Sequence, residues 1–242
     1  MTLALGCACL AFASIVGGAT GFGTALVASP LMLLVGVDVP DVVAVVLVVG
    51  LVTRCAVMVR LREHVAWSRV SLLALGSVPG AWTGAAVLHV VSTHYLKIAA
   101  GVLAVLCGIS MLLVRSPEQP RSPSAAASAT TGAVGGFLST TTALNGPPPA
   151  LLLTWAGTPP LVFIADMAGY FTIVSAVSLV ILGAGGQIPQ SVLWPALPAY
   201  IAVALAGTGV GLWIARRTPI EAFRLAVIGL VVVAGALTAL TA

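Results

Sequence analysis

Gly80-Ala81-Trp82-Thr83-Gly84 has a counterpart in Gly207-Thr208-Gly209-Val210-Gly211, and both stretches lie in apolar surroundings. In each copy a basic residue follows thirteen positions after the last glycine, Lys97 in the first and Arg224 in the second. The likeness extends upstream, where Gly36-Val37-Asp38-Val39-Pro40 resembles Gly157-Thr158-Pro159-Pro160. The repeated spacing indicates that the chain is a tandem duplication.

The composition places this duplication in a membrane. The chain has 242 residues, of which 60% are hydrophobic and 7% charged, and its mean hydropathy is +1.17. No charged side chain occurs in residues 1–37, 122–165 or 167–215, and each run exceeds the ~20 residues that one helical span needs. We therefore expect an all-α, polytopic helical bundle that is embedded in the lipid bilayer and crosses it several times.

A polar, proline-rich run divides the chain near its middle. Residues 115–128 contain Arg115-Ser116-Pro117-Glu118-Gln119-Pro120-Arg121 and read as a linker. The prediction is a first transmembrane repeat in residues 1–114 and a second in residues 129–242.

Each predicted repeat begins with a broken segment. Leu3–Val16 and Phe22–Val35 have about 14 residues each and rise only ~21 Å as helix, less than the ~30 Å hydrocarbon core. They are separated by a glycine-rich stretch, residues 17–23, and read as a broken span or a re-entrant pair. In the second half, Ala129–Leu144 is followed by a break at residues 145–149.

Longer apolar segments complete each half. Their predicted bounds are Asp41–Val59, Trp67–Leu88 and Thr93–Val114 in the first half, and Leu161–Leu182, Ser191–Ala215 and Ile220–Ala242 in the second.

The basic residues report orientation. With a net charge of +4, a soluble domain would suggest nucleic acid, but here the charges lie between apolar runs, so we expect no nucleic-acid partner. Clusters occur at residues 60–69, 115–121 and 216–224. Placing all three in the cytoplasm leaves residues 183–190, the corresponding join of the second half, outside. The two halves are then inverted, with Lys97 as the one basic residue on the outer side.

The two breaks are the best candidates for a binding site. A helix that starts at membrane depth offers free N–H groups and a positive dipole end, which attract an anion. Asn145 is a predicted N-cap and Pro147 a predicted first helical residue. Alternatively, the glycines only allow tight packing and the hydroxyls bond to their own helices. The candidate substrate-binding residues at the breaks are Thr20, Gly21, Phe22, Gly23, Thr24, Thr142, Asn145, Gly146 and Pro147.

Arg54 and Asp166 are the ionisable residues well inside apolar segments, where such residues normally face a protein interior or a water-filled path. Arg54 follows Thr53, and the comparable place in the second half is near Ser175, so we include all four in the candidate site. Arg54 would supply a counter-charge to the substrate or would snorkel toward the membrane surface. Asp166 would be linked to proton movement or would pair structurally with a basic side chain.

The sequence offers little for catalysis. Four cysteines lie in apolar runs, with no CxxC pair and no Cys/His cluster, so we expect no metal site, no cofactor and no catalytic residues.

With these motifs, the chain resembles the sulfite exporter TauE/SafE family of membrane permeases. The match is carried by Gly21-Phe22-Gly23 with Pro30, by Asn145-Gly146-Pro147-Pro148 with Gly157, and by the two repeated glycine motifs. The resemblance implies a transporter of sulfite, thiosulfate, a sulfonate or a related organosulfur or carboxylate anion in the cytoplasmic membrane of a prokaryote. The chain departs from the family pattern at Gly23-Thr24-Ala25 and at Asn145, where a glycine is common.

The sequence therefore favours a secondary transporter whose small-anion substrate lies between two half-helix N-termini near the bilayer midplane. Its transport is expected to be driven by a coupling ion, a proton or sodium, or by the membrane potential. Three alternatives stay open: an intramembrane enzyme, a membrane subunit that transports nothing, and a passive channel. The sequence leaves the substrate and the oligomeric state undetermined.

Overall fold

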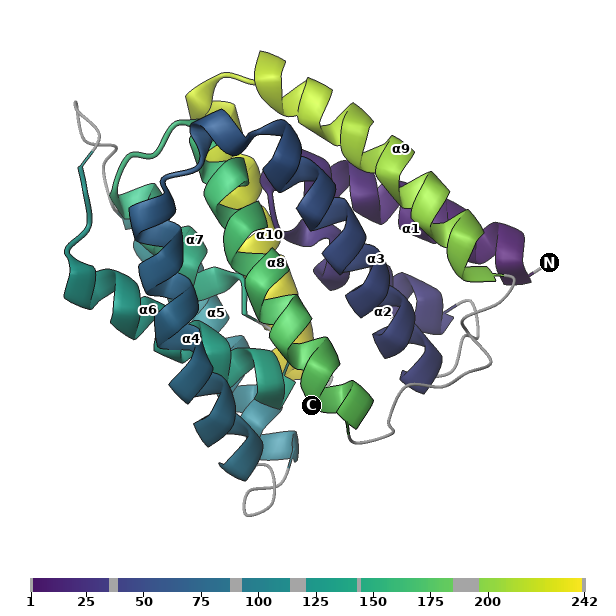
Figure 1. The fold of residues 1–242 in the computed structure, drawn as a ribbon, viewed down its shortest axis with the longest axis horizontal. Coiled ribbons are helices and arrows are strands. Elements are labelled where there is room, and N and C mark those ends of the chain that lie inside the picture. The colour runs from purple at the N-terminus through teal and green to yellow at the C-terminus, as the bar shows by residue number, and fades with distance from the viewer. Residues whose placement is uncertain are drawn as a thin grey trace.

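The protein is a bundle of helices (Figure 1). The computed structural model describes residues 2–34, 39–87, 93–113, 121–142, 145–184 and 196–240. These residues contain no strand, so the predicted all-α class is confirmed. In chain order the elements are α1 (Thr2–Thr20), α2 (Gly23–Leu34), α3 (Val39–Arg60), the short 3₁₀ helix η1 (Arg62–His64), α4 (Trp67–Val87), α5 (Thr93–Leu113), α6 (Ala125–Thr142), α7 (Pro147–Trp155), α8 (Pro160–Ala184), α9 (Ala196–Arg217) and α10 (Ile220–Leu240).

Each half begins with a helical hairpin. Helix α2 folds back along α1, so that the thiol of Cys9 donates to the carbonyl of Leu31 and Gly17 lies against Thr24. In the second half, the backbone N–H of Arg121, just before α6, donates to the carbonyl of Ala156 at the end of α7. The start of α6 therefore lies beside the end of α7, and both hairpins turn at their breaks.

The first break is shorter than the sequence predicted. Gly17 and Gly18 lie inside α1, which continues to Thr20, and only Gly21 and Phe22 separate it from α2. The predicted pair of 14-residue segments is thus wrong: α1 has 19 residues and α2 has 12. Glycine inside a helix is tolerated where another helix packs closely against it, and both glycines meet such neighbours here.

The repeated glycine motifs pack the two halves together. On α4, side chains at Gly76 and Gly80 would overlap the backbone of Ala129 and Ala133 on α6. On α9, a side chain at Gly211 would overlap the carbonyl of Ile15 on α1. Small residues let helix backbones approach closely, and both pairs of helices run parallel.

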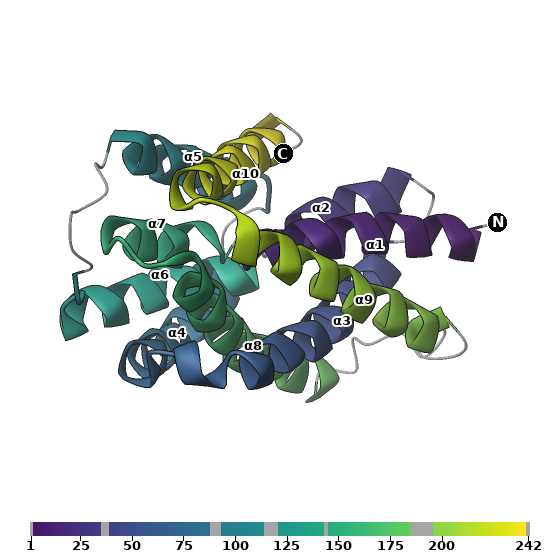
Figure 2. The ribbon, with the colours of Figure 1, turned by 90° about the horizontal axis from the view of Figure 1, so that it is seen from above.

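The packing partners match between the halves. The fourth helix of each half lies along the first helix of the other, giving the pairs α4 with α6 and α9 with α1. The third helices, α3 and α8, pack together, as do the fifth helices, α5 and α10. In Figure 2, α4, α6 and α7 lie to the left and α1, α2 and α9 to the right, with α5 and α10 along the upper edge and α3 and α8 along the lower edge.

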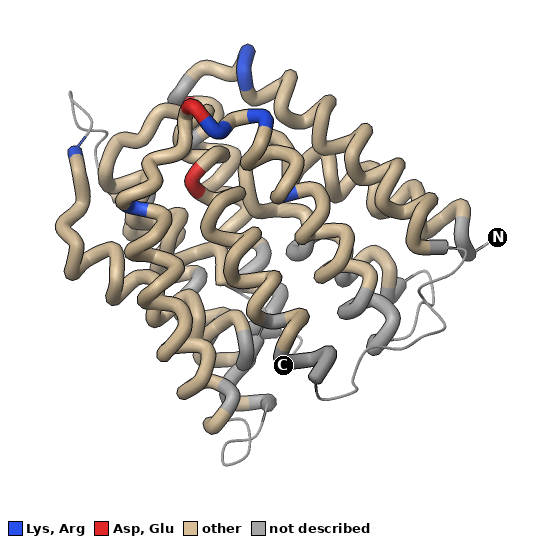
Figure 3. The backbone as a smooth tube through the Cα atoms, in the orientation of Figure 1, with Lys and Arg blue, Asp and Glu red and all other residues tan. Residues whose placement is uncertain are grey.

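The outer surface is apolar along the helices and charged at one end. Large apolar side chains face outward, including Trp82 and Leu113, which are both 80% exposed. Figure 3 shows most of the described charged residues at one end of the bundle, where α3 ends, α4 and α8 begin and α9 ends, while Arg121 lies apart, just before α6. By length and composition, α8 (Pro160–Val177) and α9 (Leu197–Arg217) contain windows long and apolar enough to cross a membrane. Such a surface suits lipid better than water.

Candidate functional site

The first break is a tight turn held by local hydrogen bonds. Gly21 has a backbone φ of 90°, a conformation that residues other than glycine rarely adopt. Its N–H donates to the carbonyl of Gly17 over 2.8 Å. The hydroxyl of Thr20 donates to the carbonyl of Val16 over 2.8 Å and accepts the N–H of Gly23 over 3.3 Å. The chain therefore needs glycine at position 21 to reverse direction.

Arg54 reaches from α3 into this turn. Its Nη1 donates to the carbonyl oxygens of Gly17 (3.3 Å) and Gly21 (2.5 Å), and its Nη2 donates to the hydroxyl of Thr24 (3.0 Å). The residue is only 5% exposed. Of the two orientations left open by the sequence, snorkelling is therefore wrong, and the side chain points into the protein.

The charge of Arg54 has no acidic partner among the described residues. Carbonyls at the C-terminus of α1 carry partial negative charge and compensate part of it. The guanidinium Cζ also lies 5.8 Å from the ring centroid of Phe171 on α8. A guanidinium has five N–H donors, and the three hydrogen bonds described leave donor capacity for a further acceptor.

The second break is built from prolines. Helix α7 begins at Pro147, as predicted, and Pro148 and Pro149 follow it, so its first three residues have no N–H to donate. The predicted N-cap is wrong: Gly146 occupies that position, with no capping side chain. The side-chain amide of Asn145 donates instead to the hydroxyl of Ser139 on α6 over 3.3 Å.

The two breaks meet inside the protein. A Cβ atom added to Gly146 would lie 2.8 Å from Cδ2 of Phe22, which is 4% exposed. A Cβ atom added to Gly21 would lie 3.2 Å from Cα of Ile164 on α8. The structure thus brings Gly21, Phe22 and Gly146 together, with α8 beside them.

Other predicted site residues take different places. The hydroxyl of Thr53 donates to the carbonyls of Val49 and Gly50 of its own helix. Ser175 is half-buried on α8. Thr142 ends α6, and its side chain lies outside the described residues.

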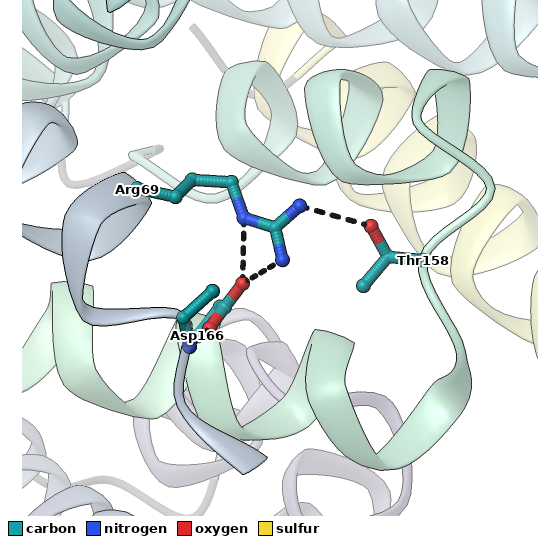
Figure 4. A network of polar contacts seen from close by, with 4 residues as sticks. Arg69, Thr158 and Asp166 are labelled. Atoms are coloured by element: carbon teal, nitrogen blue, oxygen red, sulfur yellow. Dashed lines mark hydrogen bonds and ion pairs between the residues drawn. The ribbon is translucent and has the colours of Figure 1, made fainter. Parts of the chain in front are cut away.

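Asp166 belongs to a network at the charged end (Figure 4). Its carboxylate accepts the backbone N–H of Ala66 and the Nε–H of Arg69, both over 2.8 Å, and forms an ion pair with Nη2 of Arg69. Nη1 of Arg69 also donates to the hydroxyl of Thr158 over 3.5 Å. Of the two roles left open for Asp166, the structure shows a pair with a basic side chain, which ties the start of α4 to α8.

Two hollows in the surface are apolar. One, of about 710 Å³, lies along α3 between Leu51 and Arg60. The other, of about 500 Å³, lies between α5, α6 and α7 and includes Pro148 and Trp155. Their walls are almost wholly apolar, so neither is a better place than the breaks for a charged ligand. The part of the chain that the structure describes holds no group of three His, Cys, Asp or Glu residues suited to a metal.

Sequence reasoning missed Tyr170 and Phe171. Both are aromatic residues in an apolar helix, a pattern typical of an ordinary core. They become candidate site residues through their neighbours in the structure, because Phe171 lies beside Arg54 and Tyr170 lies beside the second break. The one available signal was a tyrosine four residues past the buried Asp166.

Comparison with known families gives one match. The family model described as sulfite exporter TauE/SafE matches residues 6–238, nearly the whole chain. Searches of the curated proteins and of the solved structures found no match.

Proposed function

Because the chain belongs to the sulfite exporter TauE/SafE family of membrane transporters, we propose that it is a permease for a small oxyanion. Its substrate is sulfite, thiosulfate, a sulfonate or a related organosulfur or carboxylate anion. The protein works as a multi-pass protein of the cytoplasmic membrane, and a proton or sodium gradient or the membrane potential drives transport. The anion binds where the two breaks meet.

The buried charge of Arg54 carries this proposal. A cation withdrawn from water and left without an anionic partner costs several kcal/mol. Arg54 is such a cation among the described residues, and it lies at a break between two helices. An anion bound there would neutralise the charge of Arg54. Its oxygens would accept hydrogen bonds from the N–H groups of the planar guanidinium.

The two breaks offer different groups to the anion. The first break offers the guanidinium of Arg54, the hydroxyl of Thr24 and the N–H groups at the start of α2. Because its prolines have no N–H groups, the second break offers the anion the positive end of the α7 dipole and the side-chain amide of Asn145. In this proposal the first break binds the charge and the second orients the substrate.

The depth of both breaks suits a transport site. Arg54 is six residues from Arg60, the charged end of α3, which corresponds to ~9 Å along the helix. On α6, Gly135 lies near the carbonyl of Asn145, and the next residue, Gly136, packs against Ser77, which is ten residues or ~15 Å from the start of α4. Both positions lie inside a ~30 Å hydrocarbon core, the second near its middle and the first closer to the charged end.

The paired packing supports two inverted repeats. With the charged end in the cytoplasm, α3 and α9 run inward while α4 and α8 run outward. Helix α1, parallel to α9, then enters from outside, and α6, parallel to α4, enters from inside. The two hairpins would be re-entrant from opposite faces, and rocking of one half against the other would expose the site to each side in turn.

Purified protein in liposomes tests the proposal. Radiolabelled sulfite, thiosulfate, a sulfonate and acetate are offered separately, with and without a proton gradient, a sodium gradient and a membrane potential. We expect saturable uptake of at least one anion. When liposomes are preloaded with the labelled anion, unlabelled anion added outside should accelerate its efflux, which a passive channel would not show. Movement of none of these anions would contradict the proposal, and flux that needs a second protein would favour a subunit role.

A further inference from the structure

The hydroxyl of Tyr170 is a buried polar group without a partner. The residue has no exposed surface, and its Oη makes no hydrogen bond among the described residues. A buried hydroxyl that lacks a partner is unfavourable, since it has given up its hydrogen bonds to water. Among the described residues, the hydroxyls of Ser14 and Thr208 are also buried without a hydrogen-bond partner. Each such group requires an explanation, and for Tyr170 its position offers one.

The position of this hydroxyl supplies the explanation. A Cβ atom added to Gly135 of α6 would overlap Oη of Tyr170 and would lie 3.5 Å from the carbonyl oxygen of Asn145. The hydroxyl therefore lies over a glycine that leaves room for it, next to the residue that opens the second break. The neighbouring Phe171 lies beside Arg54, so consecutive residues of α8 reach toward the two breaks.

We propose that Tyr170 is a substrate-binding residue that donates its phenolic O–H to an oxygen of the transported anion at the second break. This inference rests on the proposed transport function. Helix α7 starts with three prolines, so its first three residues have no N–H group to donate, and the side-chain amide of Asn145 already donates to Ser139. The second break is therefore poor in free donors. The phenol of Tyr170 provides a donor there, and the anion would bind between this hydroxyl and the guanidinium of Arg54.

The chemistry defines the ligand class. A phenol donor selects a substrate with a hydrogen-bond acceptor on the side away from the guanidinium. Sulfite, thiosulfate and sulfonates carry oxygens in three directions and can meet both groups, whereas a halide presents a single atom. Tyr170 thus favours polyatomic oxyanions over chloride.

Tyr170→Phe removes the donor and leaves the ring. In liposomes that move sulfite or thiosulfate, we expect the apparent affinity for that anion to fall roughly tenfold to hundredfold, as for loss of a hydrogen bond to a charged group. The melting temperature of the anion-free protein should stay equal or rise, because the unpaired hydroxyl is gone. Competition by chloride with uptake of the labelled anion should be no weaker in Tyr170→Phe than in the wild type.

Tyr200→Phe is the matched control. Tyr200 on α9 is also buried, and its hydroxyl lies against Gly6 of α1, away from both breaks. Its removal should leave the affinity unchanged. Wild-type affinity in folded Tyr170→Phe protein would overturn the inference while the transport function stands. Failure of the wild type to move any anion would overturn both.

A second pair of variants checks the position of the hydroxyl without any substrate. Gly135→Ala should destabilise the wild type, because the new methyl group overlaps Oη. In the Tyr170→Phe background the same methyl group would lie 3.4 Å from Cζ, an ordinary contact, so the cost should largely disappear. Equal destabilisation in both backgrounds would show that the hydroxyl does not lie over Gly135, and the inference would fall.

Discussion

The two breaks occupy matching places in the two halves but are made of opposite residue types. The first, with Gly21 between two helices, keeps its backbone N–H groups and receives Arg54 from α3. The second, ahead of Pro147, has lost those N–H groups and has no guanidinium among its described contacts. In the proposed site, the first break would supply a charged side and the second a neutral one, which suits an anion that must be both attracted and oriented.

Loss of the charge should break this comparison most severely. Arg54→Gln removes the buried cation, and we expect the apparent affinity for the transported anion to fall more than ~100-fold, about 3 kcal/mol. Arg54→Lys keeps a charge but lacks the planar guanidinium, so its affinity for the anion should lie between those of the wild type and Arg54→Gln. Binding is measured by substrate-dependent thermal shift in detergent.

Arg60→Gln is the control for the loss of a charge. It removes an exposed arginine at the end of the same helix and should leave affinity unchanged. If Arg54→Gln binds like the wild type, the first break is neutral in function and the anion is held elsewhere.

The Asp166 network should respond in stability and not in binding. Asp166→Asn weakens the ion pair with Arg69, and because Arg69 is 14% exposed we expect a loss of about 2 to 3 kcal/mol. Unfolding by heat or denaturant measures this loss, and flux per folded molecule should be unchanged. Adding Arg69→Gln should cost less than the sum of the two changes. Full stability with loss of flux would assign Asp166 to the transport path.

Contact between the breaks is tested at Gly146. Gly146→Ala places a methyl group 2.8 Å from the ring of Phe22, so the ring must move and the first break with it. We expect flux to fall roughly tenfold, about 1.4 kcal/mol, with most protein still folded. Phe22→Leu in the same chain should restore part of the flux, since the smaller side chain makes room.

Gly80→Ala provides the packing counterpart. Its methyl group would overlap the backbone of Ala133, so it should lower the yield of folded protein. If both glycine variants lose folded protein alike, Gly146 serves packing and not the site.

The smallest expected effect separates two threonines. Thr24→Val removes the acceptor of the Arg54 Nη2 bond and should weaken anion affinity about fivefold, near 1 kcal/mol. Thr53→Val removes a hydroxyl that bonds only within α3 and should leave affinity unchanged. Equal values for the two variants would mean that the hydroxyl of Thr24 does not help to hold Arg54 in place.

The helices were predictable because their causes are local. Apolar length, proline and glycine indicated the starts of α4 at Trp67, α5 at Thr93 and α10 at Ile220, where the structure has them. The extent of α1 was not predictable from the same signals. Gly17 and Gly18 looked like helix breakers, but close packing against α2 and α9 keeps them helical.

By itself, the sequence determined that this chain is apolar and all-helical and that breaks fall near residues 21 and 146, because hydropathy and the positions of glycine and proline act over neighbouring residues. The tandem duplication stays a prediction. Only the tertiary structure decided that Arg54 turns inward, that Asp166 pairs with Arg69 and that Tyr170 lies at the second break. Those outcomes depend on residues up to 100 positions apart, whose approach is set by helix packing and not by local pattern.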